Sequence, residues 1–249
     1  MASFWRLVKK VIRDADIIML VLDARFPELT RNEEIEEKVE EQDKQLLYVL
    51  NKCDLVSEEK IEELSKRYRP SVFVSTKSKL GSTVLYKKIM KISQGEDCVV
   101  GVVGYPNVGK SSVINMLKGR SSASTSSDAG HTRAIKLIKA RKKISLLDTP
   151  GVLEFQEKDR LKQITIGAYN PHSLKDPEYY AMQLIEINPK IFEEYYDEIY
   201  ENDPYDFLEK ITLKKNIIMG GGKPDLKRMS KTLLYDWQRG KIHTFLIKK

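Results

Sequence analysis

An octapeptide near the middle of the chain has the residue types that bind phosphate groups. It reads Gly104-Tyr105-Pro106-Asn107-Val108-Gly109-Lys110-Ser111, with two glycines followed by lysine and serine. It follows an apolar run at 99–103 and precedes a helical pattern, which is the context that a phosphate loop requires. Glycines let backbone N–H groups surround phosphates, and the helix N-terminus adds a favourable dipole. We therefore expect these residues to hold nucleotide phosphates: Asn107, Val108, Gly109, Lys110, Ser111 and Ser112.

A second phosphate-linked motif comes 38 residues after Lys110, where Asp148-Thr149-Pro150-Gly151 ends the apolar run at 144–147. This places a carboxylate at the carboxyl end of a buried strand, where open sheets bind ligands. We expect Ser111 to ligate Mg²⁺, Asp148 to hold it through water, and the Gly151 N–H to reach the γ-phosphate. Taken alone, the tetrapeptide is equally typical of a turn. Its place after the phosphate loop favours the phosphate role.

Two further strand ends carry residues that can recognise a base. Asn51-Lys52-Cys53-Asp54 follows the apolar run at 46–50. The Asp54 carboxylate can accept from N1–H and the 2-amino group of guanine, a donor pair that adenine lacks, while the Lys52 stem packs on the base. An isolated Asn-Lys-x-Asp is often only a turn, but beside a phosphate loop it indicates guanine. Contacts to the base are also expected from Ser75, Thr76 and Lys77.

The elements that position these residues alternate between apolar runs and charged helical stretches. Runs that are apolar at nearly every position are typical of strands covered on both faces. Thr30 with Glu33 predicts a capping box at the start of one helix, and Ser57 predicts the cap of the next. We expect a doubly wound α/β domain with a mostly parallel six-stranded sheet. Its strands are expected at 17–22, 46–50, 72–74, 99–103, 135–138 and 144–147.

Composition excludes several classes of protein. The 249 residues are 41% hydrophobic and 32% charged, which excludes a disordered or fibrous chain. Two cysteines cannot form a disulfide framework. The apolar runs are shorter than the ~20 residues of a membrane span, and no signal peptide precedes them. We expect a soluble, cytoplasmic, monomeric protein that binds neither membrane nor DNA.

The net charge of +7 is unevenly distributed. Residues 1–153 carry +7, residues 154–211 carry −8 and residues 212–249 carry +8. The acidic block contains four Asn-Pro or Asp-Pro pairs, which predict several short helices. In the basic tail, Asp225 precedes a helix with a stripe of Leu226, Met229, Leu233 and Trp237. The stripe favours packing within its own domain, and the basic residues favour contact with an RNA backbone over a merely solvated helix.

The order of the motifs resembles that of a known family. The guanine-reading segments precede the phosphate loop, which precedes a switch threonine and Asp148–Gly151. This permuted order resembles the circularly permuted GTPases of the YlqF/YawG type, which act in assembly of the large ribosomal subunit. Asp23-Ala24-Arg25-Phe26-Pro27 is similar to the segment after the family's first strand, and 227–241 to its C-terminal helix. The resemblance is good over 14–153 and 220–241 and loose over 154–219.

The resemblance implies a circularly permuted P-loop GTPase domain over 1–153 and a smaller α-helical, RNA-binding domain over 154–249. It implies Thr132 as an Mg²⁺ ligand and Asn107 as a ligand of an activating K⁺. Where many GTPases place a water-orienting glutamine, this chain has Val152 and Leu153, so slow intrinsic hydrolysis is expected. His131 could lie near the attacking water, or be an exposed loop residue. The expected catalytic residues are therefore Lys110, Thr132, Gly151 and His131.

The sequence thus predicts an enzyme that hydrolyses GTP to GDP, stimulated by its partner. That partner is the large ribosomal subunit, whose rRNA the chain would bind in a nucleotide-dependent way. The alternative is a regulatory GTPase switch that binds a protein effector through its C-terminal helices. Salt-sensitive RNA binding by the second domain would favour the first hypothesis.

Overall fold

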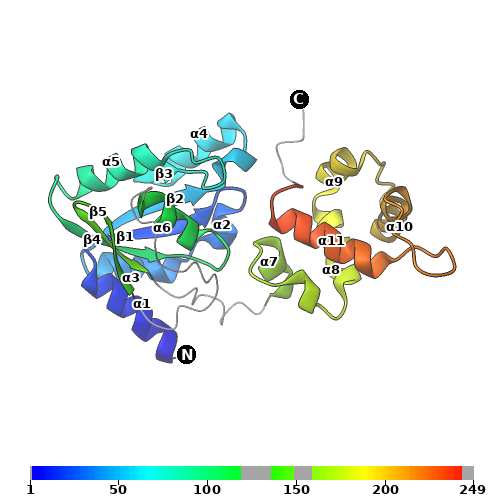
Figure 1. Cartoon of the computed structure of the whole chain (residues 1–249), viewed down its shortest axis with the longest axis horizontal. Coiled ribbons are helices and arrows are strands. Elements are labelled where there is room, and N and C mark those ends of the chain that lie inside the picture. The colour runs from blue at the N-terminus through cyan, green and yellow to red at the C-terminus, as the bar shows by residue number, and fades with distance from the viewer. Residues whose placement is uncertain (1, 119–135, 149–158, 243–249) are drawn as a thin grey trace. The chain divides into compact units, whose positions relative to one another are not determined.

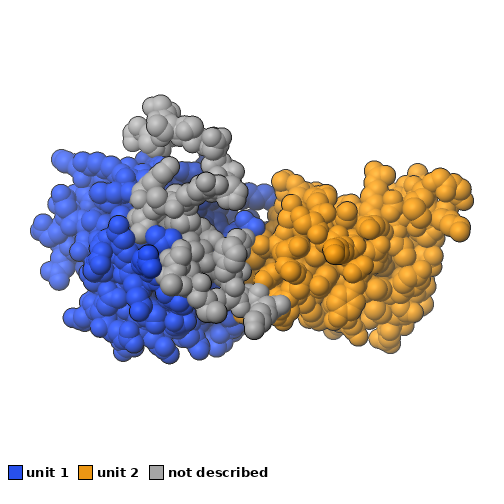
Figure 2. All heavy atoms as spheres, turned by 90° about the horizontal axis from the view of Figure 1, so that it is seen from below, with its two compact units in different colours: residues 1–156 blue, residues 157–249 orange. Residues whose placement is uncertain are grey.

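The chain forms two compact units, residues 1–156 and 157–249 (Figure 2). The computed structural model describes residues 2–118, 136–148 and 159–242. The domain boundary predicted between 153 and 154 lies outside these described residues and stays a prediction. Among the helices of the described ranges, none is long and apolar enough to cross a membrane.

The first unit is built on a six-stranded sheet in the order β3-β2-β1-β4-β6-β5. All neighbouring strands are parallel except β5 and β6, which are antiparallel. The α/β class with a mostly parallel sheet is therefore confirmed. The strands are β1 (Ile17–Asp23), β2 (Gln45–Asn51), β3 (Ser71–Phe73), β4 (Cys98–Val103), β5 (Lys136–Arg141) and β6 (Ile144–Asp148).

Helices flank the sheet, and this explains the continuous apolar runs. Every residue of β1 is buried, because a central strand of a covered sheet faces apolar side chains on both sides. Helices α1 and α3 contact each other along one face, and α5 and α6 contact each other along the other (Figure 1). The helices of this unit are α1 (Ala2–Asp14), α2 (Pro27–Thr30), α3 (Glu33–Glu41), α4 (Glu58–Arg67), α5 (Ser82–Ile92) and α6 (Lys110–Lys118).

One predicted helix cap is confirmed and one is wrong. Ser57 caps α4 and accepts a hydrogen bond from the Lys60 N–H at 3.2 Å. The residue that caps α3 is Asn32 and not Thr30. Thr30 is fully buried at the end of α2, where its hydroxyl accepts from the Asp23 N–H at 3.1 Å. Helix α3 begins at Glu33, so Asn32 occupies the cap position, whereas Thr30 is still the last residue of α2.

The strand order reverses between β1 and β4, since successive strands are added first on one side of β1 and then on the other. In open parallel sheets, ligands bind beyond the carboxyl ends of the strands at this reversal. Asp23 ends β1, Asn51 ends β2, Gly104 follows β4 and Asp148 ends β6. The topology therefore brings the predicted motifs to one edge of the sheet.

The second unit is helical, as predicted. Its core holds Phe192 and Trp237 in a stacked pair with ring centroids 5.6 Å apart. Met229, Leu233 and Trp237 of the predicted stripe are buried, so the stripe packs within its own unit, while Leu226 is half-buried. Its helices are α7 (Arg160–Thr165), η4 (Pro171–Ser173), α8 (Pro177–Ile187), α9 (Pro189–Tyr196), α10 (Pro204–Lys214) and α11 (Leu226–Gln238).

The four Asn-Pro and Asp-Pro pairs all begin helices, with proline in the first turn. Asn170 and Asp203 also cap through their side chains, as Asp225 does for α11. Asp176 and Asn188 make no such side-chain bond. At these two positions the fixed φ of proline starts the helix without help from the preceding side chain.

Candidate functional site

The loop between β4 and α6 has a backbone that only glycine fits at two positions. Gly104 has φ +146°, and a Cβ there would lie 2.4 Å from the carbonyl oxygen of Val21. Gly109 has φ +102°, and a Cβ there would lie 2.1 Å from Nδ2 of Asn51. Both values of φ belong to the region that disfavours side chains. The two glycines therefore let the loop approach β1 and the end of β2 closely.

Lys110 begins α6 and folds back over its own loop. It is buried, and its Nζ donates to the carbonyl oxygens of Gly104 at 2.8 Å and Tyr105 at 2.6 Å. Its ammonium therefore lies against the backbone of the predicted phosphate loop. Asn107 is exposed with φ 58°, and Ser111 and Ser112 are exposed in the first turn of α6. A cation at a helix N-terminus with exposed hydroxyls suits a phosphate group and its counterion.

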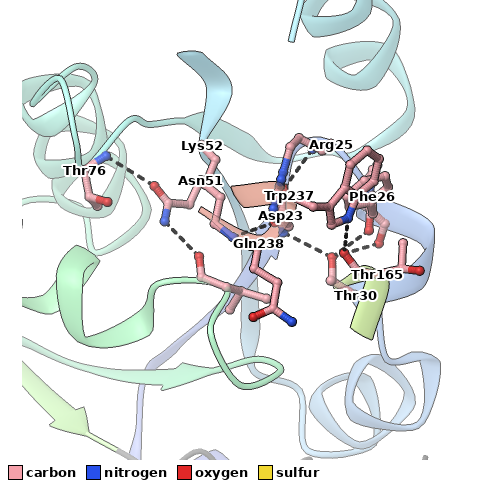
Figure 3. Close-up of polar contacts among 12 residues, drawn as sticks. Asp23, Arg25, Phe26, Thr30, Asn51, Lys52, Thr76, Thr165, Trp237 and Gln238 are labelled. Atoms are coloured by element: carbon pink, nitrogen blue, oxygen red, sulfur yellow. Dashed lines mark hydrogen bonds and ion pairs between the residues drawn. The ribbon is translucent and has the colours of Figure 1, made fainter. Parts of the chain in front are cut away.

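Asn51 connects the predicted guanine motif to the phosphate loop. Its side chain is buried, its Nδ2 donates to the Val108 carbonyl oxygen at 2.8 Å, and its Oδ1 accepts from the Thr76 N–H at 3.3 Å. Figure 3 shows the carboxamide of Asn51 pointing toward Thr76. One side chain thus fixes three segments relative to one another.

The residues that follow Asn51 make a tight turn. Lys52 has left-handed backbone angles, φ 64° and ψ 31°, and precedes the short helix η1 (Cys53–Leu55). This conformation is costly for a residue with a Cβ, and such residues concentrate at functional sites. The turn leaves Asp54 partly exposed, so its carboxylate is open to the predicted contact with a base.

The segment after β3 supplies the other predicted base contacts. Ser75 is fully buried, and its Oγ accepts from the Ser78 N–H at 3.1 Å. Thr76 is half-buried against Asn51, and Lys77 is exposed. Ser75 therefore shapes this segment, and Thr76 and Lys77 lie where a ligand can reach them.

A buried ionic cluster of Asp23, Arg25 and Lys52 lies beside this turn, and none of the predicted phosphate or base contacts includes Asp23 or Arg25. The Asp23 carboxylate is fully buried. It forms ion pairs with Nη2 of Arg25 at 2.8 Å and with Nζ of Lys52 at 2.7 Å (Figure 3). Burial by itself raises the pKa of Asp23, but Arg25 and Lys52 outweigh it and hold that pKa at about 2. Burial lowers the pKa of Lys52, and Asp23 opposes that change. The sequence signals for this cluster are an acid directly after a buried strand and the similarity of Asp23-Ala24-Arg25-Phe26-Pro27 to the segment after the family's first strand.

The residues predicted to bind Mg²⁺ are only partly described. Asp148 pairs with Val102 of β4 in the parallel register, close to the start of the phosphate loop. Ser111 stands exposed in the first turn of α6. Hydroxyl and carboxylate oxygens are the donors that Mg²⁺ prefers, so the residue types at positions 111 and 148 suit that ion. The predictions for His131, Thr132 and Gly151 lie outside the described residues.

The described ranges contain no group of three or more His, Cys, Asp or Glu residues that could hold a metal ion. A nucleotide-bound Mg²⁺ does not need such a group, because phosphates and water supply most of its ligands.

The chain is similar to known GTPases and GTP-binding proteins. Residues 99–187 match the family model described as 50S ribosome-binding GTPase. The chain is 39% identical to an uncharacterized GTP-binding protein of Methanocaldococcus jannaschii, over 97% of this chain and 66% of that protein. It is 35% identical to nucleolar GTP-binding protein 2 of Candida glabrata, over 98% of this chain and 52% of that protein. The chain thus spans about half to two thirds of these relatives' length.

A GDP-bound structure of YlqF from Thermotoga maritima superposes with a TM-score of 0.67 at 25% identity, over 95% of each chain. The chain belongs to the YlqF-type family of circularly permuted GTPases. In a permuted GTPase, the guanine motifs lie on strands that precede the phosphate loop in sequence. Here β2 and β3 precede β4 in the chain, yet the contact between Asn51 and Val108 joins the two parts of the site.

Proposed function

We propose that this chain binds GTP and GDP, hydrolyses GTP, and acts in assembly of the large ribosomal subunit by binding its rRNA in a nucleotide-dependent way. The observation that carries the nucleotide part is the hydrogen bond of 2.8 Å from Asn51 to Val108. It fixes a guanine-reading turn against a phosphate-binding loop, so base and phosphates of one nucleotide are recognised together.

In this proposal each motif keeps the role that its chemistry suggests. Asp54 accepts from the two donors of guanine, and Lys110 exchanges the carbonyl oxygens of its own loop for phosphate oxygens. That exchange is favourable because an ammonium binds a charged oxygen more strongly than a neutral one. Ser111 and Asp148 would hold Mg²⁺, which neutralises charge on the β- and γ-phosphates.

Hydrolysis by the isolated chain is expected to be slow. Val152 and Leu153 cannot orient a water molecule, so binding of a partner would activate hydrolysis. Asn107 would hold an activating K⁺, Thr132 would complete the Mg²⁺ shell, Gly151 would contact the γ-phosphate, and His131 would lie near the attacking water.

The second unit supports the RNA part of the proposal through charge. Lys223, Lys227 and Arg228 are exposed, and none of them forms an ion pair with another residue of the described ranges. The apolar stripe of α11 is used in packing, so the basic side chains remain for an outside partner. An RNA backbone is the partner that such a surface fits.

The experiment that tests the proposal measures GTP hydrolysis by the full chain with and without large ribosomal subunits. We expect a low rate alone, a several-fold higher rate with subunits, and tighter subunit binding with a non-hydrolysable GTP analogue than with GDP. An unchanged rate together with equal binding in both nucleotide states would contradict the proposal. Salt-insensitive binding to a protein partner in place of subunits would support the regulatory switch instead.

A further inference from the structure

Asp23 belongs to none of the nucleotide motifs, yet both of its oxygens are engaged. Oδ1 accepts from the backbone N–H and Nε of Arg25, each at 3.0 Å. Oδ2 accepts from Nη2 of Arg25 at 2.8 Å and Nζ of Lys52 at 2.7 Å. The backbone of Asp23 is held as well, because its N–H donates to Thr30 Oγ1. The carboxylate therefore has one fixed orientation.

Arg25 alone would satisfy this carboxylate. Its side chain is 1% exposed, lies over the Phe26 ring at 5.1 Å, and makes two hydrogen bonds to Asp23. Lys52 adds a second positive charge to a cluster that Arg25 has already neutralised, and the two cations repel each other. Neutralising the buried acid thus does not require Lys52.

What the contact does is fix the direction of the Lys52 side chain. Asn51 and Lys52 are consecutive, but Asn51 turns to the phosphate loop and Lys52 turns to Asp23 (Figure 3). The left-handed backbone at Lys52 permits this divergence. A free lysine side chain samples many rotamers, whereas one held at its tip presents its methylene groups along one line.

We propose that Asp23 is a positioning residue for guanine recognition, which holds the ammonium of Lys52 so that the methylene stem forms a preset platform for the base. This inference rests on the proposed binding of guanine nucleotides. Presetting the stem removes an ordering cost that nucleotide binding would otherwise bear. The base is common to GDP and GTP, so both nucleotides benefit equally.

The first test compares GDP and GTP affinities of wild type and Asp23→Asn by titration calorimetry. We expect Asp23→Asn to weaken both nucleotides by a similar factor, about ten-fold. In a Lys52→Ala background, the same substitution is expected to change affinity by less than about two-fold, because its target is already absent. A purely structural role predicts the same fold-loss in both backgrounds, and that result would overturn the proposal.

Two further variants separate positioning from stability. Arg25→Gln weakens the cluster but leaves the Lys52 ion pair and the Arg25 backbone N–H in place, so we expect a lower melting temperature with nearly unchanged GDP affinity. Asp23→Glu keeps the charge but moves the carboxylate by one methylene in a fully buried site, so we expect affinity to fall while the melting temperature falls no further than in Arg25→Gln. If Asp23→Asn does not fold, the Asp23→Glu and Arg25→Gln pair decides the matter.

The outcomes distinguish this inference from the proposed function. A wild-type chain that binds no guanine nucleotide contradicts the proposed function itself. A wild-type chain that binds GDP while folded Asp23→Asn and Asp23→Glu bind it equally tightly overturns only the role of Asp23.

Discussion

Asn51 donates a 2.8 Å hydrogen bond to the backbone carbonyl of Val108 across 57 residues of sequence. The bond joins the end of β2 to the loop that follows β4. Gly109 lies next to it, since a Cβ at that residue would be 2.1 Å from Nδ2 of Asn51. In the proposed nucleotide site, recognition of the base and of the phosphates would therefore depend on this one buried carboxamide.

Asn51→Ala should uncouple these two parts of the site. It removes the bonds to Val108 and Thr76 and leaves a buried carbonyl oxygen without its donor. We expect GDP and GTP affinities to fall about ten-fold or more, since such losses cost roughly 1–3 kcal/mol. Titration calorimetry measures the affinities. The matched control is Asn32→Ala, which removes the cap of α3 and should cost about 1 kcal/mol of stability without weakening nucleotide binding.

Gly109→Ala should disrupt the same contact from the other side. Its Cβ would lie 2.1 Å from Nδ2 of Asn51, so either the loop or the carboxamide must move. We expect a loss of nucleotide binding in a chain that still folds. Gly95→Ala is the control, because Gly95 also has positive φ, +82°, but nothing within 4 Å of its Cβ. Equal effects of the two substitutions would show that backbone strain, and not the contact with Asn51, causes the loss.

The buried cluster should make stability depend on acid pH. The pKa of Asp23 is lowered from 3.8 to about 2 by Arg25 and Lys52 against the effect of burial. A lowered folded-state pKa gives stability that is present above about pH 4 and is lost as the pH falls toward 2, a contribution of about 2 kcal/mol. Urea unfolding of wild type and Asp23→Asn measures it. The gap between their unfolding free energies should narrow between pH 4 and 2, and a constant gap would contradict this account.

The basic residues around the start of α11 should govern binding to rRNA. Lys227→Glu with Arg228→Glu removes two exposed cations in the first turn of that helix. We expect weaker binding to large ribosomal subunits and a salt dependence whose slope falls by about 2, because each phosphate contact contributes roughly 0.9. Lys66→Glu on α4, also exposed, is the control and should bind as wild type does. If the double substitution leaves both affinity and slope unchanged, the RNA contact lies elsewhere.

The sequence predicted the elements well because their signals are local. Continuous apolar runs located all six strands of the described sheet, and the proline pairs located the starts of η4, α8, α9 and α10 in the second unit. The spacing of Gly104, Gly109 and Lys110 placed a loop between β4 and α6. Each of these signals depends on residues within a few positions of one another.

Contacts between residues that are far apart in the sequence could not be predicted from local sequence patterns. Thr30 has a good capping sequence, but its hydroxyl bonds Asp23 and Asn32 caps α3 instead. The ion pair of Lys52 with Asp23 depends on β1 and β2 pairing in register at Asp23 and Asn51. Composition and residue spacing do not predict that strand register, so no role for Asp23 could be predicted from the sequence.

The central claim is that this chain recognises guanine through the Asp54 carboxylate. The most direct test changes the base of the nucleotide and residue 54 together. The affinities of wild type and Asp54→Asn for GDP, xanthosine diphosphate (XDP) and ADP are measured by titration calorimetry. Asparagine offers an N–H donor where the carboxylate accepts, and xanthine carries an oxygen where guanine carries the 2-amino group. We predict that wild type prefers GDP by a wide margin and that Asp54→Asn prefers XDP. A wild-type chain that binds ADP as tightly as GDP, or a variant that still prefers GDP, would contradict the account.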